Sequence, residues 1–217
     1  MTFHLIIGNR NYSSWSMRAW LLLRLSGAPF EETVVPLYEQ GSRARVEALG
    51  GETGLVPVLN VGGMPVWDTL AIAETLYELY PAVWPARPSD RARARSYAGE
   101  VHSGLNALRE AMPVNTRGRR RQAVVTPAVQ ADIDRVNTIW ARAGQSDSPW
   151  LLGDFCAIDI FFAPVATRFR TYGVEVPVQA RPYCEALLAH PWVQEWCQMG
   201  FEEQALISSL EMPALPG

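Results

Sequence analysis

Three short polar segments carry the side chains best suited to chemistry, and the first is residues 12–16, YSSWS. It lies between an expected strand and an expected helix. The first N–H groups of a helix lack partners within the helix, and the helix dipole is positive there. A serine at such a place is either a helix N-cap or a hydrogen-bond donor to a bound anion. A serine nucleophile is not indicated, because no Gly-x-Ser-x-Gly motif surrounds these residues.

The other two segments are Val56-Pro57 and Trp67-Asp68-Thr69. Proline gives up a backbone donor, so it is expected at the edge or the start of a strand, and the bond that precedes it can be cis. Asp68 and Thr69 open an expected helix, where both residue types are ordinary caps. The same two residues also place a carboxylate beside a helix N-terminus. A ligand with an α-amino acid end would satisfy both groups.

Composition excludes several classes of chemistry. All 19 basic residues are arginine, which excludes Schiff-base, pyridoxal-phosphate and P-loop mechanisms that need a lysine. Cys156, Cys184 and Cys197 form no C-x-x-C motif, so we expect neither a disulfide framework nor a metal site. A net charge of −3 gives no general attraction to nucleic acid or to an anionic membrane, and the arginine-rich residues 117–121 are expected to form a solvated loop.

Hydrophobic periodicity and turn residues predict two domains. Residues 1–82 are expected to form a small α/β domain in the order βαβαββα, residues 83–88 a linker, and residues 89–217 an all-helical domain. The chain has no apolar run long enough to span a membrane and no signal-peptide pattern, so we expect a cytoplasmic protein. The predicted elements are strands 3–8, 32–36, 56–60 and 64–67, and helices 16–26, 42–49, 69–80, 90–112, 129–143, 156–172, 181–189 and 192–199, with a loose tail at 213–217.

In this order the segments resemble the cytosolic glutathione transferases over essentially the whole chain. The similarity is carried by YSSWSMRAWLLLRLSGAPFEE at 12–32, LVPVLN at 55–60, VWDTLAIAETL at 66–76 and LLGDFCAIDIFFAPVATRF at 151–169. The SSW opening is most similar to the serine-type zeta and tau classes and related bacterial enzymes. The resemblance implies a thioredoxin-like first domain, a helical domain that contributes the electrophile site, glutathione as co-substrate, and a homodimer.

The resemblance also implies a role for the residues of the first and second segments. Counted back from Gly27, Ser13 falls where these classes keep the catalytic serine, which donates a hydrogen bond to the glutathione thiolate. Ser14 is a second candidate for this contact, and Tyr12 is a third. Val56, before an expected cis proline at Pro57, would pair its backbone with the cysteinyl unit of glutathione.

The two ends of glutathione and the electrophile are assigned in the same way. Asp68 and Thr69 would hold the γ-glutamyl end, and either Gln40 or Arg43 would reach the glycyl carboxylate. Candidates for the electrophile site, each of which can equally be a packing residue, are Trp15, His102, Met112 and Asn115.

The chain departs from the family pattern at two positions. Leu55 stands where many members have a lysine, and Cys156 replaces the serine or threonine that caps the sixth helix, while Asp159 is kept. We expect the cap to be weaker, because a thiol is a poor acceptor. The implied function is conjugation of glutathione to small electrophiles in detoxification. The alternatives are a zeta-like cis–trans isomerase of the maleylacetoacetate type and a non-catalytic binding module.

Overall fold

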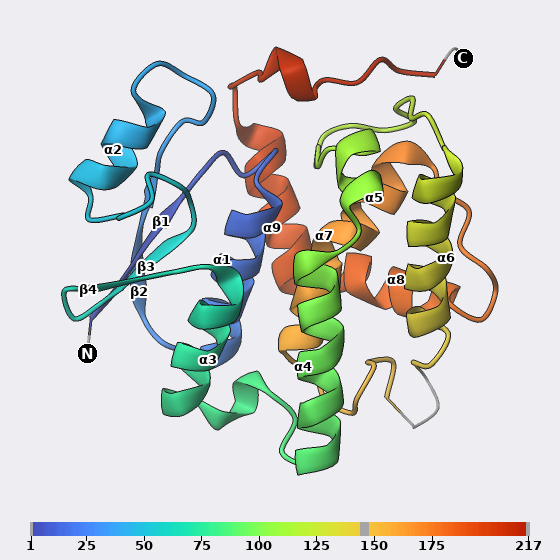
Figure 1. The fold of residues 1–217 in the computed structure, drawn as a ribbon, viewed down its shortest axis with the longest axis horizontal. Coiled ribbons are helices and arrows are strands. Elements are labelled where there is room, and N and C mark those ends of the chain that lie inside the picture. The colour runs from blue at the N-terminus through green and yellow to red at the C-terminus, as the bar shows by residue number, and fades with distance from the viewer. Residues whose placement is uncertain (1, 144–147, 216–217) are drawn as a thin grey trace.

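The N-terminal part of the chain is built on one mixed sheet of four strands (Figure 1). A computed structural model describes residues 2–143 and 148–215 of the chain. The strand order is β2-β1-β3-β4, with β1 parallel to β2 and the other neighbours antiparallel. The strands are β1 (Phe3–Ile7), β2 (Phe30–Val34), β3 (Val58–Val61) and β4 (Met64–Trp67).

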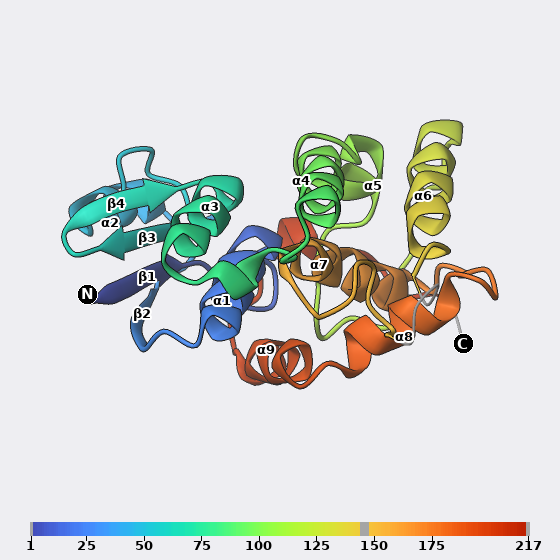
Figure 2. The ribbon, with the colours of Figure 1, turned by 90° about the horizontal axis from the view of Figure 1, so that it is seen from below.

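Helices cover both faces of this sheet because successive strand residues point to opposite sides. Leu5 and Ile7 of β1 pack in the main core with helices α1 (Ser14–Ser26) and α3 (Thr69–Leu79). Ile6 points the other way and packs against Val46 of α2 (Ser42–Ala48). The element order confirms the predicted thioredoxin-like βαβαββα domain, and Figure 2 shows the sheet beside the helical part of the molecule.

The remainder of the described chain is helical, as predicted, although the long helix expected at 90–112 is wrong. It is divided between α4 and α5 by Gly104, whose N–H donates to Glu100 O, and by Leu105, which has a positive φ of 57°. A glycine ends a helix readily, and the left-handed residue after it turns the chain. The elements are η1 (Pro81–Val83), α4 (Pro88–Ser103), α5 (Asn106–Ala111), α6 (Pro127–Trp140), α7 (Ala157–Tyr172), α8 (Arg181–Ala189), α9 (Pro191–Glu202) and η2 (Ser208–Leu210).

Helix α7 is the centre of the helical part and is buried on all sides over nearly its whole length. Its first turn is fixed by the buried carboxylate of Asp159, which accepts hydrogen bonds from Cys156 N at 2.9 Å and from Tyr183 Oη at 2.7 Å. The carboxylate half of the expected cap is therefore in place. On the opposite side, Arg18 of α1 donates to Phe161 O of α7 at 3.1 Å, which joins the two halves of the protein.

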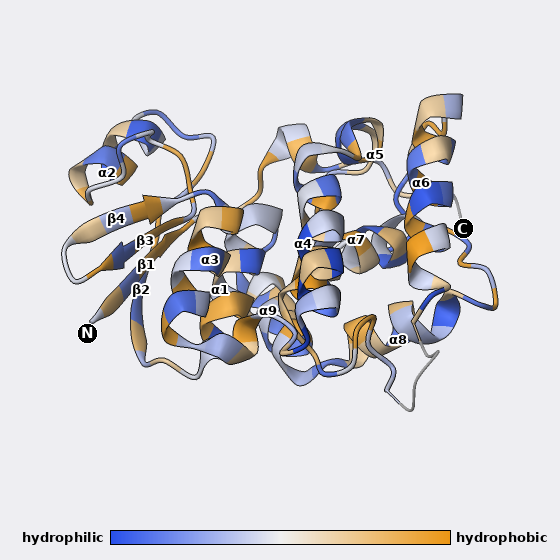
Figure 3. Cartoon of the chain, turned by 60° about the horizontal axis from the view of Figure 1, so that its bottom comes forward, coloured by the Kyte–Doolittle hydropathy of each residue, from blue (hydrophilic) through white to orange (hydrophobic). Residues whose placement is uncertain are grey.

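The distribution of hydrophobic residues follows this arrangement. Hydrophobic residues are frequent in β3, in β4 and along α1, while hydrophilic residues recur along the outer helices α4 and α6 (Figure 3). In the part of the chain that the structure describes, no helix is both long and apolar enough to cross a lipid bilayer.

The C-terminal segment is held in place rather than loose. Gln122 N donates to Pro213 O at 2.8 Å, and Leu215 N donates to Arg120 O at 2.7 Å. The expectation of a loose tail is therefore wrong for residues 213–215, and residues 216–217 lie outside the described residues. The backbone of Arg120 is thus bonded to the tail, while the side chains of Arg119 and Arg120 remain exposed, as expected for a solvated loop.

Candidate active site

Two adjoining cavities lie where the first domain meets the helical part. The larger, about 860 Å³, is lined by the start of α1, most of residues 37–47 but not Gln40 or Arg45, residues 54–56, Arg109 of α5, and Leu210. The smaller, about 440 Å³, is lined by Pro57, Asp68, Thr69 and His102 among others. Trp15, Leu55 and Val56 line both cavities. We call the two adjoining spaces the cleft, and Leu55 lines both of them.

Ser13 is the N-cap of α1 and lines the larger cavity. Its Oγ accepts a hydrogen bond from Ser16 N at 3.2 Å and donates one to Ser16 Oγ at 2.8 Å. Ser16 Oγ in turn accepts from Gly8 N at 2.9 Å. The capping role is thus present, and the Ser13 hydroxyl is already engaged in two hydrogen bonds with Ser16.

Ser14 is the first residue of α1 and lines the same cavity. Its Oγ accepts a hydrogen bond from an Nη of Arg168 at 3.4 Å. Among the described residues, none accepts its hydroxyl proton. A hydroxyl that sits at a helix N-terminus, beside a guanidinium, with a free proton is placed to donate to an anion. The geometry therefore favours Ser14 over Ser13 as the donor.

Tyr12 also reaches the larger cavity, but its hydroxyl is occupied. It donates to Glu211 Oε1 at 2.6 Å and accepts from an Nη of Arg117 at 2.9 Å. Burial and the bond to Glu211 raise the pKa of the Tyr12 phenol. The phenol remains protonated and bonded to the C-terminal segment, so the geometry does not favour Tyr12 as a thiolate donor.

The Val56–Pro57 peptide bond is cis, as the resemblance implies. Both residues line the smaller cavity immediately before β3. This places the backbone of Val56 at the wall of the cleft, next to the start of α1 and across from the start of α3. An extended ligand can pair with such a backbone in the manner of an added strand.

Asp68 and Thr69 lie at the start of α3, at the other end of the smaller cavity. Asp68 Oδ1 accepts from Leu70 N at 2.8 Å, and Asp68 Oδ2 lies 3.0 Å from His102 Nε2. The Oγ1 of Thr69 is buried and has no hydrogen-bond partner among the described residues. A carboxylate and an unpaired hydroxyl thus meet here, which suits the amino and carboxylate groups of an α-amino acid end.

His102 belongs to this end of the cleft. Burial, followed by the charges of Arg18 and Arg109, lowers the pKa of the imidazole against the opposing effect of Asp68. The imidazole is therefore neutral at pH 7, and its Nε2 is in place to donate to Asp68. Its ring also meets the ring of Trp15 edge-on, with centroids 5.2 Å apart. His102 is placed to orient Asp68 rather than to contact an electrophile in the larger cavity.

A cluster of three arginines, Arg18, Arg109 and Arg168, lies around Trp15 and Ser14 at the start of α1, and no local sequence pattern indicated it. Arg109 and Arg168 line the larger cavity, and Arg18 lies beneath it, with its guanidinium 4.6 Å from the ring centre of Trp15. Arg18 and Arg168 are 0% and 5% exposed. None of the three has an ion pair with a carboxylate in the described parts of the chain. Burial and the charge of Arg109 lower the pKa of Arg168 to about 9, which leaves it charged at neutral pH.

Three other candidates from the sequence do not reach the cleft. Gln40 is exposed and lines neither cavity, although its neighbours Gly41 and Arg43 line the larger one. Met112 is buried and lines a separate cavity near α6. Asn115 is buried, and its Oδ1 accepts from Gly118 N at 2.8 Å. Of the two residues expected near the glycyl carboxylate, Arg43 lines the cleft and Gln40 does not.

Comparisons with known proteins agree with this geometry. Residues 12–79 match the family model "Glutathione S-transferase, N-terminal domain". A crystal structure of a glutathione transferase homolog from Burkholderia BGR1, with bound glutathione, superposes with a TM-score of 0.70 at 27% identity, covering 92% of this chain and 98% of that one. The first domain is therefore similar to the N-terminal domain of glutathione S-transferases, and the chain as a whole shares the fold of a glutathione transferase homolog.

Two further similar proteins carry the names of isomerases. A maleylacetoacetate isomerase from Rhizobium meliloti is 38% identical over 98 residues, which is 44% of this chain and 46% of that protein, so the match spans about half the length of this relative. The holo structure of maleyl pyruvate isomerase, a bacterial zeta-class transferase, shares the fold with a TM-score of 0.67 at 22% identity, covering 94% of this chain and 100% of that one.

Proposed function

We propose that the protein binds glutathione in the cleft and ionises its thiol, and that the thiolate then forms a sulfur–carbon bond with a small electrophile, which releases its leaving group, such as the chloride of a chloroarene. One observation carries the proposal: the hydroxyl-bearing start of α1, the cis bond before Pro57 and the Asp68–Thr69 corner all open into one cleft. These groups match the thiol, the backbone and the γ-glutamyl end of a single tripeptide. A cytoplasmic homodimer remains part of the proposal, supported by family resemblance.

The proposed binding mode assigns a task to each wall of the cleft. Asp68 accepts hydrogen bonds from the α-amino group of glutathione, while Thr69 and the N-terminus of α3 donate to the adjacent carboxylate. The backbone of Val56 pairs with the cysteinyl unit, and Arg43 faces the glycyl carboxylate. This arrangement directs the sulfur toward the start of α1.

The proposed activation relies on three groups that favour a thiolate. A free thiol has a pKa near 8.5, so only a few per cent is ionised at neutral pH. Each unit by which the pKa falls requires about 1.4 kcal/mol of preference for the anion. A hydrogen bond to a charged group contributes about 1.5–3 kcal/mol. The Ser14 hydroxyl, the α1 dipole and the charge of Arg168 together suffice to bring the pKa below 7. Ser13 caps the helix that holds them.

A second candidate function, a glutathione-dependent cis–trans isomerase, is favoured by the arginine cluster. The same thiolate would add reversibly to a carbon–carbon double bond and leave again after rotation, with no net change in atoms. Arg109 and Arg168 form no ion pair with a carboxylate of the described chain, and a substrate with its own carboxylate would pair with them. The curated relative from Rhizobium meliloti is named a maleylacetoacetate isomerase.

The experiment that tests both candidates is a paired assay with glutathione, using a chloroarene and a maleyl-type acid. Formation of a thioether from the chloroarene supports conjugation, while conversion of the acid without consumption of glutathione supports isomerisation. Calorimetric titration with glutathione tests the third possibility. Absence of binding heat and of both activities would indicate a non-catalytic module and would contradict the proposal.

A further inference from the structure

Two of the groups that would favour the thiolate belong to different parts of the molecule. Ser14 is the first residue of α1 in the first domain, and Arg168 lies on α7 in the helical part. The bond from an Nη of Arg168 to Ser14 Oγ is 3.4 Å long. A bond of that length is weak and cannot by itself hold two helices at a fixed distance. Other contacts near Ser14 must therefore set how the two groups lie relative to each other.

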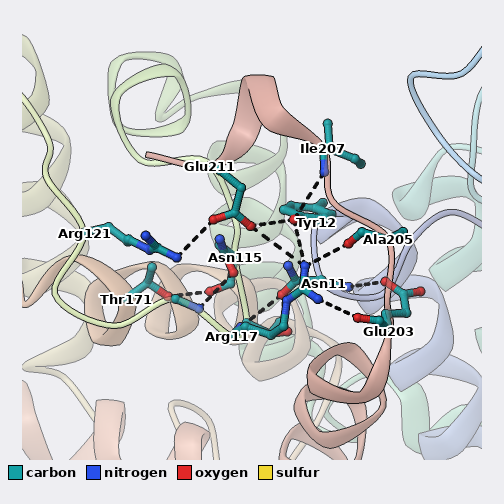
Figure 4. A network of polar contacts seen from close by, with 12 residues as sticks. Asn11, Tyr12, Asn115, Arg117, Arg121, Thr171, Glu203, Ala205, Ile207 and Glu211 are labelled. Carbon is teal, nitrogen blue, oxygen red and sulfur yellow. Dashed lines mark hydrogen bonds and ion pairs between the residues drawn. The ribbon is translucent and has the colours of Figure 1, made fainter. Parts of the chain in front are cut away.

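Asn11, three residues before Ser14, makes contacts of this kind and is 0% exposed. Its side-chain Oδ1 accepts hydrogen bonds from Thr116 Oγ1 at 2.8 Å and from Arg117 N at 3.0 Å. Its backbone O accepts from Thr116 N at 3.1 Å, and its backbone N donates to Glu203 Oε2 at 3.1 Å. Figure 4 shows Asn11 between Arg117 and Glu203. Each of these bonds ends on the helical part, so Asn11 joins the two parts of the molecule directly before the start of α1.

The segment that receives Asn11, residues 112–117, is also the segment that holds Arg168. The Nε of Arg168 donates to Met112 O at 2.8 Å. The segment is thus bonded to Arg168 at one end and, through Thr116, to Asn11 at the other. It forms a short bridge from the guanidinium on α7 to the residues that lead into α1.

The packing around this bridge leaves little space for movement. Gly200 of α9 lies against it, and a Cβ at that position would be 2.5 Å from Thr116 Oγ1 and 3.1 Å from Asn11 N. On the side of α1, Asn9 O accepts from Ser13 N at 2.9 Å, which makes residues 9–13 a tight turn. Closely packed groups transmit a displacement instead of absorbing it. A shift at Asn11 therefore reaches the start of α1.

We propose that Asn11 is a positioning residue of the reaction, which holds Ser14 of the first domain in place relative to Arg168 of the helical part. The inference rests on the proposed function, because it concerns activation of the thiol in the same cleft. Asn11 lines neither cavity of the cleft, so it acts through other residues and not on glutathione itself. Its loss should impair ionisation of the thiol and leave the affinity for glutathione unchanged.

The first test removes the side-chain bond from either side, with Asn11→Ala and with Thr116→Val. Valine has the shape of threonine without the hydroxyl that donates to Asn11 Oδ1. We expect each variant to raise the thiol pKa of bound glutathione by about one unit, the equivalent of one weakened hydrogen bond to an anion. The pH profile of kcat should move to higher pH by the same amount. Thr116→Ser keeps the hydroxyl and should retain the wild-type pKa. Ultraviolet titration of the glutathione complexes measures these values.

The matched control is Asn115→Ala, because Asn115 is a second buried asparagine, 1% exposed, in the same network (Figure 4). Its Oδ1 accepts from Gly118 N at 2.8 Å, so its side-chain bond stays within its own turn. The Nδ2 of Asn115 and that of Asn11 are both buried without a hydrogen-bond partner among the described residues. We expect Asn115→Ala and Asn11→Ala to lose similar stability in chemical denaturation, while Asn11→Ala alone moves the thiol pKa.

The outcomes separate the role of Asn11 from the proposed function. If wild-type protein ionises bound glutathione and Thr116→Val does so with the same pKa, the positioning role is overturned and the proposed function stands. An equal shift in Asn115→Ala would also overturn it, because the effect would then come from a general loosening of the segment. If Asn11→Ala does not fold, the comparison of Thr116→Val with Thr116→Ser decides. If wild-type protein does not bind glutathione, the proposed function fails, and the role of Asn11 fails with it.

Discussion

The two ends of the cleft are built in contrasting ways. The end assigned to glutathione is made by backbone and by residues near the ends of elements in the first domain: the cis bond at Pro57, and Asp68 with Thr69 at the start of α3. The end assigned to the electrophile combines α1 with side chains of α5 and α7 and with Leu210 from the far end of the chain. The surface assigned to glutathione is thus built within the first domain, whereas the wall assigned to the electrophile is built by segments from other parts of the chain. Substitutions in those segments can change the choice of electrophile without changing the binding of glutathione.

Of the effects predicted for substitutions in the cleft, the largest is a loss of turnover at the start of α1. Ser14→Ala removes the hydroxyl with a free proton, so turnover should fall about 10- to 100-fold, the loss of one hydrogen bond to a charged group. Ser13→Ala should instead reduce stability by about 0.5–2 kcal/mol, as the loss of an N-cap does. Steady-state kinetics and thermal unfolding of both variants check this. The assignment fails if Ser13→Ala loses the greater turnover while its stability is unchanged.

At the glutathione end, Asp68→Asn should weaken glutathione binding about 10-fold, because an amide cannot replace the charge that faces the α-amino group. Calorimetric titration measures the dissociation constant directly. His102→Gln is the companion variant: it keeps a donor toward Asp68 and should change the dissociation constant much less. An unaltered constant in Asp68→Asn would remove this residue from the binding site.

At the electrophile end, Arg109→Gln should leave glutathione affinity unchanged and lower kcat/KM for a carboxylate-bearing electrophile about 5-fold relative to a neutral one. The expected loss is smaller because Arg168 retains its charge nearby. Competition between acidic and neutral electrophiles in one reaction measures the ratio. Equal losses for both substrates would mean that Arg109 supports packing against Trp15 rather than substrate charge.

The smallest effect is expected at Asp159, in the first turn of α7, the helix that also carries Arg168. Burial raises the pKa of Asp159 to about 6. The folded state therefore retains this proton at a pH where the unfolded chain has released it, so the stability it contributes is present at low pH and is lost as pH rises through about 4 to 6. Asp159→Asn should cost about 1 kcal/mol and should flatten this part of the stability curve. Chemical denaturation between pH 4 and 7 gives both quantities, and an unchanged slope would contradict the assignment.

Much of the first domain was predictable from the sequence because its signals are local. Alternating apolar strands, capping residues before α3 and Gly27 after α1 each act within a few positions, and together they predict the βαβαββα order. The prediction of one continuous helix over residues 90–112 was wrong, because it gave more weight to the helix-forming residues around Gly104 than to the glycine itself.

The electrophile end was less predictable because its residues meet only through long-range packing. Arg18, Arg109 and Arg168 lie on three different helices, and in a chain whose basic residues are all arginine the residue type alone gives no signal. Met112 was expected in the site but faces another cavity, since the direction of a side chain depends on how its segment packs. Glu211 reaches Tyr12 across almost the whole chain, a contact that no local pattern indicates.

The most direct test of the account is an ultraviolet titration of the protein saturated with glutathione, following the absorbance of the thiolate. We predict that the thiol of bound glutathione has a pKa below 7, so that the sulfur is mostly ionised at neutral pH. In Ser14→Ala this pKa should move back toward 8.5. A bound thiol that is still protonated at neutral pH in the wild-type protein would contradict it.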